Sequence, residues 1–324
     1  MNKQKVGLVA CSSILERRFL PALKASEFAQ PFIIGSRDKN KARGWAAKYG
    51  IEEYGTYDDA LTHPDVDWVY ISTPPTEHES QIIKAAEQGK HILCEKPAAM
   101  SFDSAKRISN ICQANGVRFL EGYVYQFHPQ HAYIKSKLSE LGKPYMLRSQ
   151  FTYPRPKEGD IRFDASLGGG VLYDSLGYTI HIGLQFFEGE PELTSLEVFI
   201  DEQSGVDQAI ALMLKFPNGP VLQCLAGFGM QYRSHYEVIC EKGYISPKRA
   251  YSINEDVAPE IVIETPGGDT VQKLKPAHQF LLMINAFCHH IQTGEETSFI
   301  NKASFLRIHK VMNACRNALN EKLS

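Results

Sequence analysis

The sequence predicts an α/β protein: a doubly wound parallel sheet followed by an α+β domain with a large, mostly antiparallel sheet. Short apolar strands alternate with helical segments over the first third of the chain, which favours parallel strands joined by crossover helices. After about residue 125, long alternating runs are separated by turn residues, which is typical of antiparallel strands. We therefore expect two domains, residues 1–123 and 124–324.

The first domain reads as strand, helix, strand. Apolar runs predict strands at residues 6–9, 31–35, 67–73, 91–95 and 118–123. Helical spacing predicts helices at residues 14–23, 39–49, 77–88 and 101–115, and residues 57–61 read as a short polar turn segment. Gly50, Gly89 and Gly116 follow three of these helices and indicate C-caps.

The second domain begins with a predicted helix at residues 130–141. Alternation predicts strands at residues 146–153, 193–200, 209–216, 221–228, 236–240 and 261–264. The chain ends in a helix over residues 301–324 with one apolar face, which indicates packing against the domain.

Composition excludes several classes of protein. The formal net charge is −2 and the 35 basic residues are interspersed with 37 acidic ones, so we expect no nucleic-acid partner. No stretch approaches a membrane span, and the short polar start predicts no signal peptide, so we expect a cytoplasmic protein. The seven cysteines show no C-x-x-C pair, and we expect free thiols and no metal site.

The end of the first strand resembles a dinucleotide-binding turn without its glycines. In G-x-G-x-x-G the glycines permit a tight turn and close approach to the pyrophosphate, but here those positions hold Ala10, Ser12 and Leu15. Ala10 does not easily adopt a positive φ. A turn without a ligand is an equally good interpretation of this stretch alone.

The end of the second strand favours NADP. Where an acidic residue would hold the ribose of NAD, the chain has Ser36 and Arg37, and arginine there accommodates a 2′-phosphate. The alternative is that Ser-Arg-Asp only begins a helix with an N-cap.

Two later strand ends carry further candidates. In "STPPTEHE", His78 either faces the ligand or is simply hydrated. In "CEKPAAM", Pro97 imposes an extended conformation on Lys96, which makes this lysine a candidate for polarising a substrate oxygen.

The densest candidate stretch of the second domain is residues 160–187. It contains three glycines, Gly168–Gly170, which permit close approach to a ligand or to another element. The helical run after them places Asp174, Tyr178 and His181 on one face. A buried polar face with structural hydrogen bonds is the alternative; the preceding glycines favour a site.

These motifs together resemble the glucose-fructose oxidoreductase, inositol dehydrogenase and MocA family (Gfo/Idh/MocA). The resemblance rests on "DVDWVYISTPPTEHESQIIKAAEQGKHILCEKP" and "LGGGVLYDSLGY" and extends over the whole chain. It implies a Rossmann domain followed by a substrate-binding and oligomerisation domain. "LEGYVYQFHPQ" and "DIRFDASLGGG" are most similar to the branch of sugar, nucleotide-sugar and diol oxidoreductases, whereas inositol dehydrogenases have histidine at the position of Tyr178.

The resemblance implies a hydride transfer between NADP, with NAD as the alternative, and a sugar or polyol. Lys96, Tyr178 and Asp174 are then the catalytic residues, with Tyr178 moving the proton and Lys96 assisting it. Substrate contacts are expected from Tyr125, Arg162, Asp174 and His181. Cofactor contacts are expected from Cys11, Ser12, Ser13, Ile14, Ser36, Arg37, Thr73, Pro74, His78, Glu95 and Lys96.

The missing glycines bear on how the cofactor is held. We expect backbone amides and the hydroxyls of Ser12 and Ser13 to contact the phosphates, and the unusual Ala10 to weaken binding. The resemblance also implies a homodimer or homotetramer formed through the second-domain sheet. A non-catalytic protein that senses a dinucleotide or sugar is the alternative to an enzyme.

Overall fold

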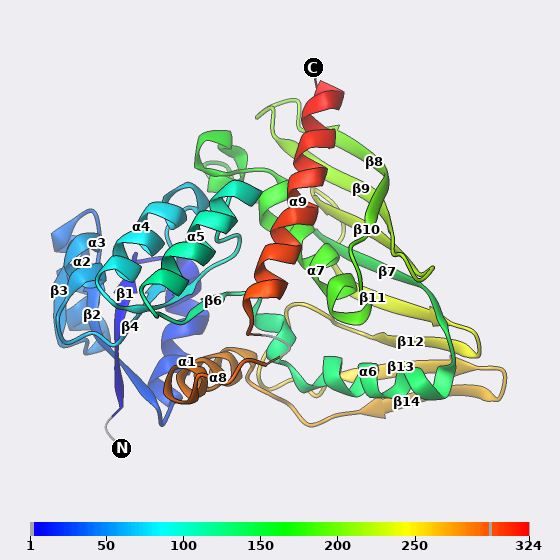
Figure 1. The fold of residues 1–324 in the computed structure, drawn as a ribbon, viewed down its shortest axis with the longest axis horizontal. Helices are drawn as coiled ribbons and strands as arrows, with labels where there is room; N and C mark the ends of the chain where they lie inside the picture. Colours follow the sequence, from blue (N-terminus) through cyan, green and yellow to red (C-terminus); the bar gives the residue numbers. More distant parts are fainter. Residues whose placement is uncertain (1–2, 298–299, 324) are drawn as a thin grey trace. The chain divides into compact units, whose positions relative to one another are not determined.

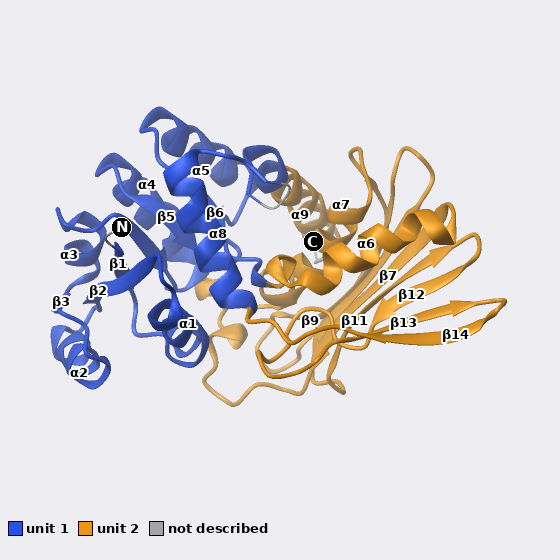
Figure 2. Cartoon of the chain, turned by 90° about the horizontal axis from the view of Figure 1, so that it is seen from below, with its two compact units in different colours: residues 1–124, 279–306 blue, residues 125–278, 307–324 orange. Residues whose placement is uncertain are grey.

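The computed structural model describes residues 3–297 and 300–323. The chain divides into two compact units (Figure 2): residues 1–124 with 279–306, and residues 125–278 with 307–324. The two-domain expectation placed all residues after 123 in one domain. Residues 279–306 instead return to the first unit, where Phe287 packs edge-on against Trp68 with ring centroids 5.4 Å apart.

The first unit contains a six-stranded sheet in the order β3-β2-β1-β4-β5-β6 (Figure 1), with every pair parallel. Its strands are β1 (Gln4–Val9), β2 (Ala29–Gly35), β3 (Glu53–Gly55), β4 (Trp68–Ile71), β5 (His91–Cys94) and β6 (Phe119–Glu121). The predicted doubly wound parallel sheet is confirmed, and β3 was not predicted because three residues give too short a pattern.

Helices cover both faces of this sheet. They are a π-helical segment (Leu15–Phe19) that continues into α1 (Leu20–Ala25), α2 (Lys39–Tyr49), α3 (Tyr57–Thr62), α4 (Pro75–Glu87), α5 (Phe102–Ala114) and α8 (Gln279–Thr293). Strand alternation distributes β4 between the layers: Val69 and Ile71 join the cluster with α4 and α5, and Tyr70 stacks on Phe19 on the other side. The sheet is therefore buried on both sides.

Three helix ends follow the prediction. Gly50, Gly89 and Gly116 have φ values of 63°, 69° and 65°, the left-handed conformation that ends a helix. The polar segment at residues 57–61 was predicted as a turn, but it is α3. Thr56 and Asp59 form a capping box there, which nucleates a short helix without a long apolar pattern.

The second unit contains an eight-stranded sheet in the order β14-β13-β12-β11-β7-β10-β9-β8. Its strands are β7 (Pro144–Tyr153), β8 (Glu192–Ile200), β9 (Asp207–Lys215), β10 (Val221–Phe228), β11 (Arg233–Cys240), β12 (Gly243–Pro247), β13 (Glu260–Thr265) and β14 (Gly268–Lys273). All neighbours are antiparallel except β7 and β10, which confirms the mostly antiparallel sheet. β14 was not predicted, since its side chains are all exposed and give no alternation.

The helices of the second unit are α6 (Pro129–Leu141), α7 (Gly177–Phe186) and most of α9 (Lys302–Leu323), with 3₁₀ turns at Ile161–Phe163 and Ala165–Leu167. A π-helical segment (Leu172–Leu176) continues directly into α7, and we call residues 171–186 the site helix. It packs closely on the sheet, because a Cβ at Gly183 would lie 2.3 Å from Leu222 Cδ2.

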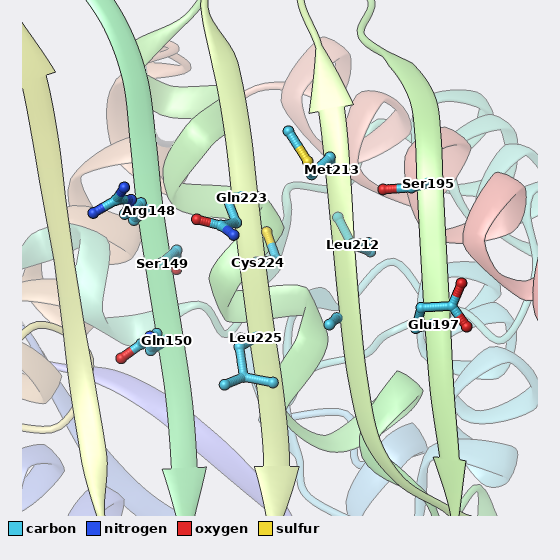
Figure 3. Close-up of a pocket in the computed structure, with 11 residues that line it drawn as sticks. Arg148, Ser149, Gln150, Ser195, Glu197, Leu212, Met213, Gln223, Cys224 and Leu225 are labelled. Carbon is cyan, nitrogen blue, oxygen red and sulfur yellow. The ribbon is translucent and has the colours of Figure 1, made fainter.

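The opposite face of this sheet is open. Figure 3 shows Arg148, Gln150, Gln223, Leu225 and Met213 standing on that face, around a shallow hollow of about 300 Å³. None of the helices in the described part of the chain is long and apolar enough to cross a membrane.

Candidate functional site: strand ends of the first unit and a helix of the second

The turn after β1 holds a strained alanine. Ala10 has φ +88°, a conformation that L-residues rarely adopt, and its amide donates to the Gly35 carbonyl at 3.1 Å. Alanine does not easily take this conformation, and the hydrogen bond to the neighbouring strand holds the backbone in it. The turn thus keeps the shape of a glycine turn without the glycine.

Ser12 starts the helix that follows this turn. Its hydroxyl accepts from the Leu15 amide at 3.2 Å and lies 2.7 Å from the Ser72 hydroxyl. Ser13 is exposed, and both Cys11 and Ile14 are half-buried. The first amides of a helix are a binding site for anions, so this end fits a dinucleotide phosphate.

The end of β2 combines an N-cap with a basic side chain. Asp38 caps α2 by accepting from the Asn40 amide at 2.8 Å, and the buried Ser36 hydroxyl accepts from the Asp38 amide at 3.2 Å. Arg37 is exposed and hydrogen-bonds the Tyr57 hydroxyl, whose pKa is raised by burial and lowered by Arg37, with a net rise. Asp38 is therefore an N-cap, as the alternative interpretation expects, and Arg37 beside it is still exposed and suited to contact a phosphate.

The sequence predicts that His78 contacts the cofactor, but in the structure His78 is buried inside the first unit. Its ring is 1% exposed, with Nδ1 2.8 Å from the Pro97 carbonyl and Nε2 2.8 Å from the Thr73 carbonyl. Burial lowers the pKa of His78, whereas both carbonyls favour the charged ring, since both nitrogens donate only when both carry hydrogen. His78 therefore joins two strand ends and leaves no ring nitrogen for a ligand.

Thr73 is likewise engaged with the protein. Its side chain is 6% exposed and its hydroxyl donates to Gln81 Oε1 at 2.8 Å. Pro74, half-buried, follows it and precedes α4.

The turn after β5 is held by two carboxylates. Glu95 accepts from the Tyr70 hydroxyl at 2.6 Å, and burial raises the pKa of Glu95. Glu121, on β6, accepts from the Ala98 amide at 2.8 Å. These contacts lie on both sides of Lys96, which is half-buried. The lysine is thus carried by a turn whose flanking residues are fixed.

In the second unit, Asp174 is the centre of a charged network. Arg162 Nε lies 3.0 Å from Asp174 Oδ2, and the Tyr153 hydroxyl donates to the same oxygen. Burial is the largest single influence on Arg162 and lowers its pKa, but Asp174, Tyr153 and Asp160 together outweigh it and the net shift is upward. Burial and Asp174 together raise the pKa of Tyr153. The Asp174 carboxyl group therefore lies between a guanidinium and a phenol.

Tyr178 lies among aromatic rings. The centroid distances from its ring are 5.2 Å to Phe151, 5.8 Å to Tyr251 and 5.9 Å to Tyr125. Tyr178 itself is half-buried. Aromatic neighbours on several sides therefore restrict the orientation of the Tyr178 ring.

Tyr125 and His181, both predicted to contact substrate, bind each other. The Tyr125 hydroxyl is 2.7 Å from His181 Nδ1; Tyr125 is fully buried and His181 is 5% exposed. The structure thus supports the predicted shared face of the site helix, with His181 engaged inside the unit.

Two of the three glycines before the site helix are explained by close packing within the protein, and the third, Gly168, ends a 3₁₀ turn at φ +84°. A Cβ at Gly169 would lie 2.7 Å from the carbonyls of Arg162 and Asp164, and one at Gly170 would lie 2.1 Å from Asp207 Oδ1. Of the two alternatives, close approach to another element is therefore the one that the structure shows.

Comparison with known proteins assigns the chain. Residues 4–123 match the oxidoreductase family with the NAD-binding Rossmann fold, and residues 134–246 match the GFO/IDH/MocA C-terminal domain. The chain belongs to the Gfo/Idh/MocA oxidoreductase family. It is accordingly an NAD(P)-dependent oxidoreductase of this family, with an NAD(P)-binding Rossmann domain.

Several Gfo/Idh/MocA proteins are similar over most of their length. A dTDP-3,4-didehydro-2,6-dideoxy-alpha-D-glucose 3-reductase from Actinomadura kijaniata is 30% identical over 91% of this chain and 89% of its own. The NADP-dependent D-xylose 1-dehydrogenase 2 of Haloferax volcanii is 28% identical over 89% of each chain. A solved 3-ketoreductase from Actinomadura kijaniata, in complex with NADP and TDP-benzene, has a TM-score of 0.93 at 28% identity and 98% coverage of both chains.

The sequence missed several residues that shape this Gfo/Idh/MocA site. Tyr153 ends an alternating strand and Glu121 ends an apolar one. A polar side chain at the end of a strand could therefore have indicated both residues. Asp207 begins β9, and no local pattern connects it with a helix 35 residues earlier.

Proposed function

We propose that this protein transfers a hydride between NADP and a carbonyl or hydroxyl carbon of a sugar derivative, with Tyr178 as proton donor or acceptor and Lys96 as the assisting cation. The observation that carries the proposal is the site helix, which places a half-buried tyrosine among aromatic rings one turn from the ion-paired Asp174. Membership of the family supplies the nicotinamide chemistry.

The residues of the chain supply the cation and the proton donor that hydride transfer also requires. The nicotinamide, when bound, gives or takes the hydride. Reduction of a ketone builds negative charge on oxygen, and a nearby ammonium group stabilises that charge. A phenol within reach of the oxygen donates the proton, and a cation beside the phenol favours the phenolate left behind. We assign the ammonium to Lys96 and the phenol to Tyr178, with Asp174 holding Arg162 for substrate contact.

NADP is the proposed cofactor. The exposed Arg37 follows β2 with Lys39 and Lys41 close behind, and arginine suits the dianionic 2′-phosphate better than the neutral ribose of NAD. The helix start at Ser12, with Cys11, Ser13 and Ile14, is the proposed phosphate site. Thr73, Pro74, Glu95 and Lys96 are proposed to line the nicotinamide end, with His78 acting through Thr73 and Pro97.

A keto-sugar linked to a nucleotide is the substrate class we favour. The relatives include reductases of dTDP-linked keto-sugars, and the solved relative binds TDP-benzene. A free aldose is the second candidate, because the chain is about equally similar to a D-xylose dehydrogenase.

The first experiment is a fluorescence titration with NADPH and NADH, followed by turnover assays with a dTDP-linked 3-keto-sugar and with D-xylose. We expect tighter binding of NADPH and a loss of affinity in Arg37→Ala. Equal or tighter binding of NADH would refute the role of Arg37. Binding without turnover of any sugar would favour the non-catalytic sensor.

The second experiment tests the two catalytic residues. Tyr178→Phe and Lys96→Ala should each lower kcat by about 10²-fold or more, the usual contribution of proton transfer and of charge stabilisation. The double variant should lose little more than either single variant if both act on one step. Tyr145→Phe and Lys106→Ala, at exposed positions, are the matched controls. Near-normal turnover in either Tyr178→Phe or Lys96→Ala would contradict the proposed mechanism.

We also propose that the open face of the eight-stranded sheet forms a homodimer or homotetramer. Phe199 is 60% exposed on β8, and Met213 and Leu225 line the hollow on β9 and β10 (Figure 3). Exposed apolar side chains on one sheet face favour association. Sedimentation velocity of Leu225→Glu should show a smaller particle than the parent; an unchanged particle would exclude this face.

A further inference from the structure

The start of the site helix is held by a buried carboxylate. Asp207 Oδ2, on β9, accepts from the Leu172 amide at 2.5 Å, and the Val171 amide also donates to this carboxylate. The side chain is 9% exposed. Gly170, at φ +94°, allows this approach, because any Cβ there would overlap Asp207 Oδ1.

The end of the same helix is held by a guanidinium. Arg307, on α9, donates through Nη1 to the Leu184 carbonyl at 2.7 Å and through Nη2 to the Phe187 carbonyl at 2.8 Å. Nη2 also donates to the Gly189 carbonyl. One side chain thus satisfies three carbonyls where the helix stops.

The two charges have the signs that a helix favours. A helix leaves amide groups unpaired at its start and carbonyls unpaired at its end, and its dipole favours an anion at the first and a cation at the second. Asp207 and Arg307 supply both, through charge-assisted hydrogen bonds. A shift of the helix along its axis would break bonds at both ends.

Such anchors matter because the helix is irregular where it carries Asp174. Residues Leu172–Leu176 are π-helical, and a π segment has looser internal hydrogen bonding than an α-helix. Tyr178 follows two residues later, between the two anchored ends. Its position is thus set by contacts outside the helix as well as within it.

We propose that Asp207 and Arg307 are positioning residues that set the axial position and rotation of the site helix, and with it Tyr178. The proposal rests on the proposed function insofar as Tyr178 is the proton-transfer residue. Neither side chain is assigned any contact with substrate or cofactor.

The test places 3-fluorotyrosine at residue 178 and records its ¹⁹F resonance in the full-length protein. Asp207→Asn and Arg307→Met should each shift the resonance or split it, since the ring then samples other positions among its aromatic neighbours. Lys310→Met is the matched control: Lys310 is also on α9, and its ion pair with Glu190 at 3.4 Å is exposed. The ¹⁹F resonance of Lys310→Met should be the same as that of the parent protein.

Arg307→Lys extends the test if the larger changes prevent folding. Lysine keeps the charge but cannot bond three carbonyls at once, so it should shift the signal less than methionine does. An unchanged resonance in a folded Asp207→Asn protein, or in folded Arg307→Met or Arg307→Lys proteins, would overturn the proposal.

The ¹⁹F signal requires no substrate, so it separates this proposal from the proposed reaction. A shifted resonance together with normal turnover in Tyr178→Phe would keep the anchors and reject the mechanism. With a substrate available, both anchor variants should lower kcat per folded molecule, with the folded fraction measured from the ¹⁹F signal, and leave the affinity for NADPH unchanged.

Discussion

The two units hold their candidate residues in different ways. In the first, side chains contact main-chain groups next to the strand ends: the His78 ring lies 2.8 Å from the carbonyls of Thr73 and Pro97, 5 and 19 residues away in the chain, and Glu121 accepts from the Ala98 amide. In the second, the site helix is bonded by Asp207 across 35 residues and by Arg307 across 123. The first arrangement follows from strand order, whereas the second depends on distant charged side chains.

The largest effect on stability should come from Gly170, whose backbone lies against the Asp207 carboxylate in the second unit. Gly170→Ala forces alanine into φ +94° and places its Cβ 2.1 Å from Asp207 Oδ1. We expect the free energy of unfolding to fall by about 3–4 kcal/mol, the sum of a left-handed alanine and an overpacked contact. Urea denaturation measures it.

Gly159→Ala is the matched control for that change. Gly159 has φ +78° with nothing within 4 Å of its would-be Cβ, so only the backbone cost of about 1–2 kcal/mol remains. Equal losses in the two variants would mean that the approach of Asp207 contributes nothing.

A smaller effect is expected at the main-chain link of the first unit. His78→Ala removes the ring that lies 2.8 Å from both carbonyls and donates to one of them when neutral. The change should cost about 2–3 kcal/mol, with lower affinity for NADPH because the turns at Thr73 and Pro97 loosen. Hydrogen exchange should rise in residues 72–76 and 96–99 and stay unchanged in the site helix. His289→Ala, at an exposed side chain, is the control; faster exchange throughout both units would contradict a local role.

The difference between the units also explains what the sequence could predict. Strand ends and helix caps follow from local patterns, so Ser36, Lys96 and the glycine caps were found where the structure has them. The sequence also placed Asp174, Tyr178 and His181 on one face, because helical spacing is local. It did not show that His78 points inward, nor that Asp207 and Arg307 reach the site helix, because a strand end and a helix surface give no sign of their distant partner.

The pH dependence of stability tests the burial of Asp207 in the second unit. Burial raises the pKa of Asp207 from 3.8 to about 6, so the folded protein binds this proton more tightly than the unfolded chain does. The stabilisation is complete below about pH 4 and is lost as the pH rises through 6. Between pH 4 and 7, the free energy of unfolding of the parent should fall by about 2–3 kcal/mol relative to that of Asp207→Asn.

Urea denaturation of both proteins across that range measures the difference between the two curves, which removes the contribution of all other carboxylates. Parallel curves would show that Asp207 titrates normally and is not buried as a charge. In the first unit, burial likewise raises the pKa of Glu95, and taking the difference from Asp207→Asn cancels that contribution.

The smallest effect concerns the strained alanine of the first unit. Ala10 holds φ +88°, so Ala10→Gly should stabilise the protein by about 1 kcal/mol through relief of left-handed strain, less the larger entropy of an unfolded glycine. Ala47→Gly, at an exposed position inside α2, should instead destabilise by about 0.5–1 kcal/mol. If Ala10→Gly also destabilises, the methyl group contributes packing that exceeds the strain, and the turn after β1 is adapted to alanine rather than distorted by it. Opposite signs at the two positions would show that this turn has the backbone geometry of a glycine turn, held by the bond from Ala10 to the neighbouring strand.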